Sequence, residues 1–203
     1  MAPSIVPMGN AARTLEKTYD EYLAIERATD QKHEWIDGVV YAMAGGSLAH
    51  NRLSAQVIVE LARLIGDRPC GVYTSDQKTR SARGRLAAYP DVTVVCGEPV
   101  VHDEDPNAIT NPVVLVEVLS DSTEVVDRTT KFQRYRRLPS LKDYVLVSQH
   151  ERSIEVYSRD PEGNWVLREA SAGGRVPLSA FGASIEVDRV YRGVALEPPS
   201  PDE

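Results

Sequence analysis

The chain has 203 residues, 42% of them hydrophobic and 26% charged, which is ordinary for one globular domain. No apolar run approaches the roughly 20 residues that span a bilayer, and the N-terminus lacks the basic-then-apolar order of a secretory signal. We therefore expect a soluble, cytoplasmic protein with no membrane partner. The formal net charge of −7 argues against a nonspecific, high-affinity DNA binder, because such proteins usually carry a basic surplus.

Helix and hairpin signals come first along the chain. Residues 18–28 predict a short helix with Thr18 as its N-cap. The segment HEWIDGVVYAM, residues 33–43, predicts a β-hairpin that turns at Asp37-Gly38. A long helix is predicted over residues 47–66, because its apolar residues recur every four positions along one face and a glycine suits its C-terminal cap.

The rest of the chain alternates β-prone runs with one further helix. The predicted strands cover 72–80, 85–96, 112–120, 144–148, 153–159 and 165–169, and the predicted helix covers 121–138. The fold class is therefore α/β or α+β, with a mixed central β-sheet flanked by helices and a C-terminal β-meander. We expect residues 15–196 to form a single domain between disordered ends at 1–14 and 197–203.

Cys70 and Cys96 are the only cysteines. They lack C-x-x-C spacing, and Cys96 closes an apolar run, so buried free thiols are expected. Two cysteines are too few for a structural zinc site.

The most informative stretch is VVLVEVL, residues 113–119, in which six large aliphatic residues surround Glu117. Such a run predicts a strand covered on both faces. An unpaired ionised carboxylate there would be costly, so Glu117 needs a cation, a proton or a basic partner. A buried ion pair with an arginine or lysine is the alternative to a functional role.

A second acid, Asp91, begins the apolar run YPDVTVV and shares a strand face with Thr93 and Val95. If this strand neighbours that of Glu117, the two carboxylates converge and would repel each other unless a divalent cation lay between them. Carboxylate oxygens favour magnesium, manganese or calcium over zinc. A cap or turn role is the alternative for an aspartate at a strand start.

Three further residues are weaker candidates on their own. Lys131 lies on the predicted helix among Phe132 and Tyr135 and is placed to reach back toward the sheet, with a snorkelling surface lysine as the alternative. Glu34 lies in the hairpin, where a solvated glutamate is the default interpretation. His50 falls on the apolar side of the long helix, where a core or capping histidine is expected rather than a ligand.

Together these residues resemble the PD-(D/E)XK restriction-endonuclease-like superfamily. Glu34 in KHEWIDGVVYAM, the Pro90-Asp91 pair in YPDVTVV and Glu117 in VLVEVLS carry the resemblance. More narrowly, the chain from about Tyr19 to Val194 resembles the bacterial Uma-two-type family of proposed restriction endonucleases. The most specific stretch is EVLSDSTEVVDRTTKFQRYRRLPSLKDYVLV.

The resemblance implies a restriction-endonuclease-like fold, a homodimer and a magnesium- or manganese-dependent endonuclease acting on phosphodiester bonds of nucleic acid, DNA in the first place. It implies that Asp91 and Glu117 hold the metal ion, that Glu34 completes the metal shell, and that Lys131 orients the attacking water or stabilises the transition state. The superfamily places its lysine two residues after the glutamate. This chain has Leu119 at that position, so the resemblance implies that Lys131 on the predicted helix performs the function of the superfamily's lysine.

Two alternatives stay open. One is a catalytically silent nuclease-fold module that binds nucleic acid or protein, favoured by Leu119 and the net acidity. The other is a different metal-dependent phosphodiesterase. Basic residues near the acids are suited to binding phosphates, although a solvated basic face explains them equally well. They are Lys78, Arg80, Arg83 and Arg85 around the Gly84 turn, and Arg128, Arg134, Arg136 and Arg137 around Lys131.

Overall fold

The computed structural model describes residues 16–196, so the disorder expected at 1–14 and 197–203 lies outside the described residues. Its strands form two six-stranded sheets and one two-stranded sheet. Both large sheets are mixed, because β4 pairs with β8 and β9 with β10 in parallel while the other pairs are antiparallel. The predicted α/β (α+β) class with a mixed sheet and helices is confirmed.

The sheets are built from strands in the following spatial orders. Sheet A runs β2 (Val39–Ala42), β1 (His33–Ile36), β5 (Leu86–Ala88), β4 (Lys78–Ser81), β8 (Asp105–Ile109) and β7 (Val101–His102). Sheet B runs β12 (Trp165–Ser171), β11 (Ser153–Arg159), β10 (Asp143–Val147), β9 (Val114–Val118), β6 (Val92–Cys96) and β3 (Cys70–Thr74). Sheet C pairs β13 (Arg175–Leu178) with β14 (Ala183–Glu186).

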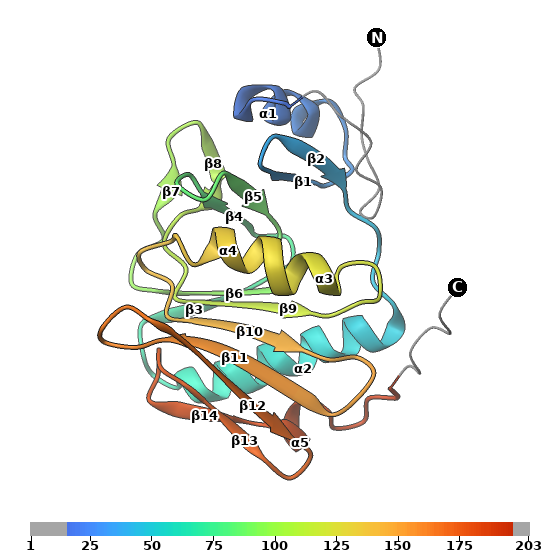
Figure 1. Ribbon diagram of the computed structural model, residues 1–203, viewed down its shortest axis with the longest axis vertical. Helices are drawn as coiled ribbons and strands as arrows, with labels where there is room; N and C mark the ends of the chain where they lie inside the picture. Colours follow the sequence, from blue (N-terminus) through green and yellow to red (C-terminus); the bar gives the residue numbers. More distant parts are fainter. Residues whose placement is uncertain (1–15, 197–203) are drawn as a thin grey trace.

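One helix packs against sheet A, and others lie on both faces of sheet B (Figure 1). They are α1 (Tyr19–Ala28), α2 (Leu48–Ile65), α3 (Glu124–Val126), the π-helical turn η1 (Asp127–Lys131), α4 (Phe132–Tyr135) and α5 (Val187–Val190). Figure 1 shows α2 along one side of sheet B, and the α3–α4 segment between sheets B and A. In the described part of the chain, no helix combines the length and the hydropathy needed to cross a membrane.

Local signals placed the first elements correctly. Thr18 forms a capping box with Glu21 at the start of α1. Asp37 and Gly38 join β1 to β2 with φ values of 52° and 91°, the positive values that a tight hairpin turn requires. The four-residue repeat of α2 is buried against sheet B, and Gly66 caps the helix.

Two predicted strands and one predicted helix are interrupted. The run 72–80 divides into β3 and β4, and the run 85–96 divides into β5 and β6, which lie in different sheets. Pro90 lies at the second break, where its missing N–H cannot continue a strand ladder. The predicted helix 121–138 is helical only from Glu124 to Tyr135 and contains the π-helical turn η1.

The expectation of free thiols is wrong, because Cys70 and Cys96 form a disulfide. The reason is register: β3 and β6 are antiparallel neighbours, and Cys70 is the direct partner of Cys96 in that pair. The two residues are 26 positions apart in the chain. Sequence spacing did not show that their strands would pair.

The two faces of β9 have different neighbours. Val114, Val116 and Val118 point into the core that α2 shares with sheet B. Leu115 and Leu119 point the other way, into the core around α4. Because side chains alternate along a strand, Glu117 faces the α3–α4 segment with the leucines. This face carries the candidate site.

Candidate functional site

A cavity of about 690 Å³ opens between β1, the N-terminus of α2, the end of β9 and η1. All four residues predicted for the site, Glu34, Asp91, Glu117 and Lys131, line this cavity. Glu34 lies on β1 of sheet A, and Asp91 lies just before β6. Glu117 lies on β9 of sheet B, and Lys131 lies on η1. The fold therefore brings together residues up to 97 positions apart, as the span from Glu34 to Lys131 in the sequence shows.

Asp91 directly precedes β6, whose antiparallel neighbour β9 carries Glu117. The antiparallel register pairs Val92 with Val116, which brings the position before β6 alongside Glu117. The backbone N–H of Val118 donates a hydrogen bond of 2.7 Å to Asp91 Oδ2. The predicted pairing of these two strands is confirmed, and a shared cation between the two acids stays a prediction.

Lys131 lies at the centre of the acidic residues. Its Nζ is 3.1 Å from Glu34 Oε1, 3.3 Å from Glu117 Oε1 and 3.1 Å from Asp127 Oδ1. The side chains in these pairs are at most 6% exposed. Lys131 is therefore not a snorkelling surface lysine, and the ammonium occupies the position from which it can act on anything bound in the cavity.

Asp127 is a member of this cluster that the sequence interpretation missed. It is 1% exposed, lines the same cavity and pairs with Lys131 one helical turn later. Asp127, Lys131 and Tyr135 recur every four residues, and this spacing was a signal that could have identified it. The Tyr135 hydroxyl donates a hydrogen bond of 3.2 Å to Glu117 Oε1, so the same helix face holds the strand glutamate.

The three sequence-predicted acids share one pattern: one oxygen is held by the protein and the other is not. Glu34 Oε1 accepts the backbone N–H of Tyr89 at 3.2 Å, whereas Glu34 Oε2 is buried without a hydrogen-bond partner. Within residues 16–196, no hydrogen bond is donated to Asp91 Oδ1 or to Glu117 Oε2. For Glu34 Oε2, which is buried, the missing partner is costly, and a cation would supply one.

Crowding of negative charge perturbs the titration of this cluster. Burial raises the pKa of the Glu117 carboxyl well above its usual value, and Asp127, Asp91 and Glu34 raise it further against the opposing charge of Lys131. Burial also raises the pKa of Glu34. Burial opposes the charge of Lys131, yet its carboxylate neighbours raise the pKa of the ammonium well above its usual value. The lysine therefore stays charged, whereas burial and the neighbouring acids favour the protonated forms of Glu117 and Glu34 as long as no further cation is bound.

The donor set fits a hard divalent cation. Four carboxylates, from Glu34, Asp91, Glu117 and Asp127, face one lysine ammonium, and oxygen ligands of this type suit magnesium or manganese. Among the residues that the structure describes, no group of three or more His, Cys, Asp or Glu is already arranged around a metal position. In this structure the Lys131 Nζ contacts three of the four carboxylates.

His50 differs from the expected core or capping histidine. Its backbone does form part of the first turn of α2, where Ser47 is the cap, but its ring lines the cavity. His50 Nε2 lies 3.2 Å from Asp91 Oδ2. Burial tends to lower the pKa of the imidazole, and the contact with Asp91 outweighs this effect and raises the pKa.

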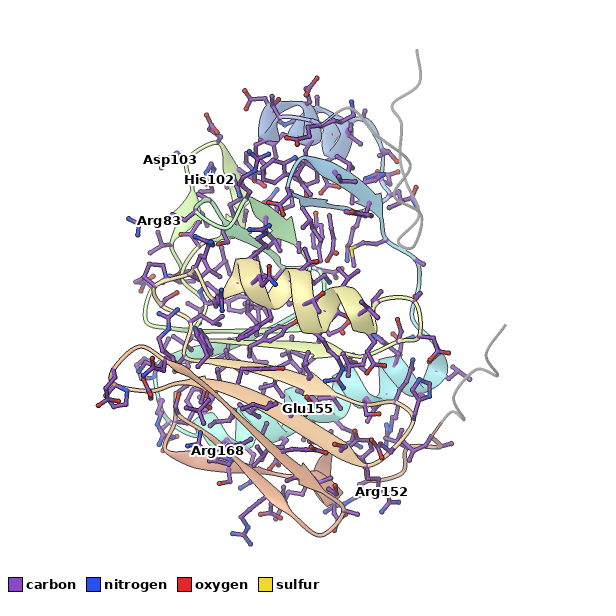
Figure 2. The ribbon with its side chains drawn as sticks, viewed as in Figure 1. Arg83, His102, Asp103, Arg152, Glu155 and Arg168 are labelled. Atoms are coloured by element: carbon purple, nitrogen blue, oxygen red, sulfur yellow. A yellow bond between two sulfur atoms is a disulfide. The ribbon has the colours of Figure 1, made fainter. Side chains whose placement is uncertain are left out.

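The basic residues predicted near the acids do not form a free phosphate-binding surface around the cavity. Lys78 and Arg80 are buried. Arg128 forms ion pairs, including one of 2.6 Å with Glu155 on β11. Arg83 projects from the edge of the molecule near sheet A, as Figure 2 shows. Lys131 and Lys32 are the two cationic side chains lining the cavity within the described residues, apart from the imidazole of His50.

Comparisons with known proteins agree on one family and one fold. The model of the Uma2 family, described as "Putative restriction endonuclease", matches residues 19–188. Two proteins of Synechocystis sp., both named as uncharacterized, are 36% identical over 177 residues and 37% identical over 158 residues. The matches cover 87% and 78% of this chain and 92% and 89% of the two relatives.

A solved structure supports the fold. It is the crystal structure of a "putative nuclease belonging to DUF820" from Anabaena variabilis, and it is similar with a TM-score of 0.64 and 14% sequence identity. The match covers 80% of this chain and 91% of that chain. At this level of identity the likeness shows a shared fold alone.

Proposed function

The chain belongs to the Uma2 family of restriction-endonuclease-like proteins, and from this premise we propose that it is a metal-dependent endonuclease that hydrolyses phosphodiester bonds in nucleic acid. Family and fold both support a nuclease. Magnesium or manganese as the metal, and DNA as the substrate, are the finer parts of the proposal. The observation that carries it is the cavity in which buried acids exceed the single lysine that contacts them.

In this proposal Asp91, Glu117 and Glu34 hold the metal ion through the oxygens that the protein leaves without hydrogen bonds. When bound, magnesium or manganese lowers the pKa of a coordinated water and neutralises charge that builds on the phosphate. Oxygens that already accept protein hydrogen bonds keep each carboxylate in place. Burial and then the neighbouring acids raise the pKa of Glu117, and a bound cation would offset both effects.

Lys131 is the group that acts on the phosphate. Its ammonium would donate hydrogen bonds to a nonbridging phosphate oxygen as negative charge develops there in the transition state. Asp127 holds Lys131 from the same helix, 3.1 Å away, so the ammonium stays at the cavity when Glu34 and Glu117 engage the metal. The helix thus supplies the ammonium group that is missing from the strand, where Leu119 occupies the position of the superfamily's lysine.

The same proposal includes one domain over residues 15–196, a homodimer and a cytoplasmic location. Sedimentation of the purified protein tests the dimer. The Cys70–Cys96 disulfide argues against the location, because disulfides are rare in cytosolic proteins. Thiol titration of protein isolated from cells under denaturing, alkylating conditions tests this point: one free thiol per cysteine supports a reducing compartment.

Hydrolysis of a small phosphodiester is the second candidate function. The cavity volume of about 690 Å³ lies in the range of small-molecule sites. Both lysines that line the cavity already contact carboxylates, so few cations remain for a long polyanion. This observation favours a substrate that brings one or two phosphates into the cavity.

Nicking of supercoiled plasmid in the presence of magnesium or manganese tests the main proposal. Wild type should nick, Asp91→Ala should not, and Asp188→Ala should behave as wild type because Asp188 is an exposed aspartate on α5. Parallel reactions with single-stranded RNA and with bis(p-nitrophenyl) phosphate separate the substrate classes. Cleavage of the small ester alone would support the second candidate, and metal binding without any hydrolysis would identify a catalytically silent module.

A further inference from the structure

The position of His50 is set by two features at the N-terminus of α2. Ser47 caps the helix by accepting the backbone N–H of His50 at 3.1 Å, and the Ser47 hydroxyl donates to Gln149 Oε1 at 3.1 Å. Gln149 follows β10 and is 4% exposed, so this bond ties the helix start to sheet B. The first turn of α2, which carries the imidazole, is therefore anchored to the sheet that carries Glu117.

Gly46 leaves the space that the imidazole occupies. A Cβ at position 46 would lie 2.6 Å from His50 Nδ1 and 2.9 Å from Cγ, which is closer than side-chain carbons approach other atoms. The ring thus packs directly against the backbone, and Nδ1 is buried without a hydrogen-bond partner. The other ring nitrogen, Nε2, is the one that faces Asp91.

The contacts of the Asp91 carboxylate fall on only one of its two oxygens. Its Oδ2 lies 3.2 Å from His50 Nε2 and accepts the Val118 backbone N–H at 2.7 Å. No residue of the described chain donates a hydrogen bond to Oδ1. The Val118 hydrogen bond and the His50 contact both fall on Oδ2, so together they restrict rotation of the carboxylate and leave Oδ1 as its free ligand atom.

We propose that His50 is a positioning residue that, through the Nε2–Asp91 contact, fixes the Asp91 carboxylate with its second oxygen directed at a divalent cation. This inference rests on the proposed metal-dependent function and adds a residue to it. Partners that orient a metal ligand typically change metal affinity or activity by about 10–100-fold when they are removed. His50 does not itself act as a ligand in this role.

Two substitutions separate positioning from simple packing. The terminal nitrogen of glutamine can reach the place of the imidazole Nε2, whereas the shorter amide of asparagine ends near the place of Nδ1. His50→Gln therefore keeps a donor for Asp91, and His50→Asn removes it. Both variants replace the ring with a neutral amide, and because the two side chains differ by one methylene, unfolding in EDTA reports any difference in packing between them.

The test is the affinity for Mn²⁺, measured by electron paramagnetic resonance and calorimetry, with unfolding in EDTA as the check on folding. Wild type should bind Mn²⁺ in a manner that Asp91→Ala abolishes. His50→Asn should bind about 10–100-fold more weakly, and His50→Gln should recover most of that loss. Asp188→Ala serves as the control acid outside the cavity.

The possible outcomes distinguish the positioning role of His50 from the metal-dependent function on which it rests. Wild-type affinity in His50→Asn, or equal losses in the two His50 variants, would overturn the positioning role and leave the metal-dependent function standing. Absence of Asp91-dependent Mn²⁺ binding in the wild-type protein would overturn both.

Discussion

Two lysines, Lys131 and Lys78, are each buried among carboxylates, and their surroundings differ. Lys78 Nζ lies 3.0 Å from Asp105 Oδ2 and 3.2 Å from Glu26 Oε2. Tyrosine hydroxyls complete this second cluster: Tyr19 donates to Asp105 at 2.9 Å and Tyr89 donates to Glu26 at 2.5 Å. The other oxygen of Glu26 accepts a backbone N–H at 2.8 Å. Both oxygens of Glu26 are therefore engaged.

Around Lys131 the carboxylates outnumber the groups that can pair with them. Three carboxylates contact one ammonium, Asp91 adds a fourth, and oxygens remain without hydrogen-bond donors. Burial of acids with a lysine is common to both clusters, so burial alone does not identify a functional site. The surplus of carboxylates around Lys131 is the feature that supports the proposed site. The Lys78 cluster serves as an internal control for the Lys131 cluster.

The largest expected effect comes from removing the ammonium of Lys131. Lys131→Ala should lower the rate of plasmid nicking about 10²–10³-fold, because it removes a preorganised donor for charge in the transition state. Lys131→Arg should recover little, since a planar guanidinium does not reproduce a compact ammonium. Cleavage rates per folded molecule, with folding checked by circular dichroism, measure this effect.

Lys78→Arg is the matched control. It alters a buried lysine in the other cluster and should leave the rate per folded molecule at the wild-type value, even if the melting temperature falls. Wild-type activity in Lys131→Ala would show that the lysine function did not move to the helix.

The pH dependence of stability should also separate the clusters. Burial raises the folded-state pKa of Glu117. A carboxyl whose pKa is raised on folding contributes stability that is complete below the unfolded pKa, near 4.5, and is lost as pH rises through the folded pKa. In metal-free protein, Glu117→Gln should therefore be more stable than wild type at neutral pH, by about 1.4 kcal/mol for each pH unit above the unfolded pKa until the folded pKa is reached.

Urea unfolding between pH 4.5 and pH 7.5 in EDTA measures this difference. Glu162→Gln, on the exposed turn after β11, should follow the wild-type curve. If Glu117→Gln were instead less stable than wild type at neutral pH, the attraction between Lys131 and the Glu117 carboxylate would outweigh the cost of burying that charge.

A smaller effect is expected at the cap of α1, the helix that carries Tyr19 and Glu26 of the Lys78 cluster. Thr18 accepts the Glu21 N–H at 3.2 Å and donates its own N–H to Glu21 Oε2 at 2.7 Å. Thr18→Ala should lower the free energy of unfolding by about 1 kcal/mol. Chemical denaturation measures the loss, and the Mn²⁺ affinity should stay unchanged. A weaker Mn²⁺ affinity would mean that the two clusters are coupled.

The sequence predicted what local chemistry determines. The cap at Thr18, the Asp37-Gly38 turn and the four-residue repeat of α2 each act within a few residues, and each element formed as predicted. The pairing of strands was not predictable in this way. The switch between sheets at Pro90 and the Cys70–Cys96 register depend on which strands become neighbours, and sheet C received no prediction at all.

In the candidate site, too, features set by nearby residues were predictable and features set by packing between distant elements were not. Asp91 and Glu117 stood out because apolar runs surround them, and the structure places both at one cavity. Asp127 was missed because an acid near the start of a helix is ordinary in sequence, and its burial arises only when α3, η1 and α4 pack between the sheets. The contact of His50 with Asp91 likewise depends on two elements 41 positions apart meeting in space.

The most direct test of the central claim is the thermal shift produced by Mn²⁺ in matched variants of the two clusters. A ligand that binds only the folded state raises the melting temperature by mass action. Wild type and the Glu26→Gln/Asp105→Asn variant should both show this shift, and Asp91→Ala/Glu117→Ala should show none. Equal shifts in wild type and Asp91→Ala/Glu117→Ala would place the cation elsewhere and contradict the account.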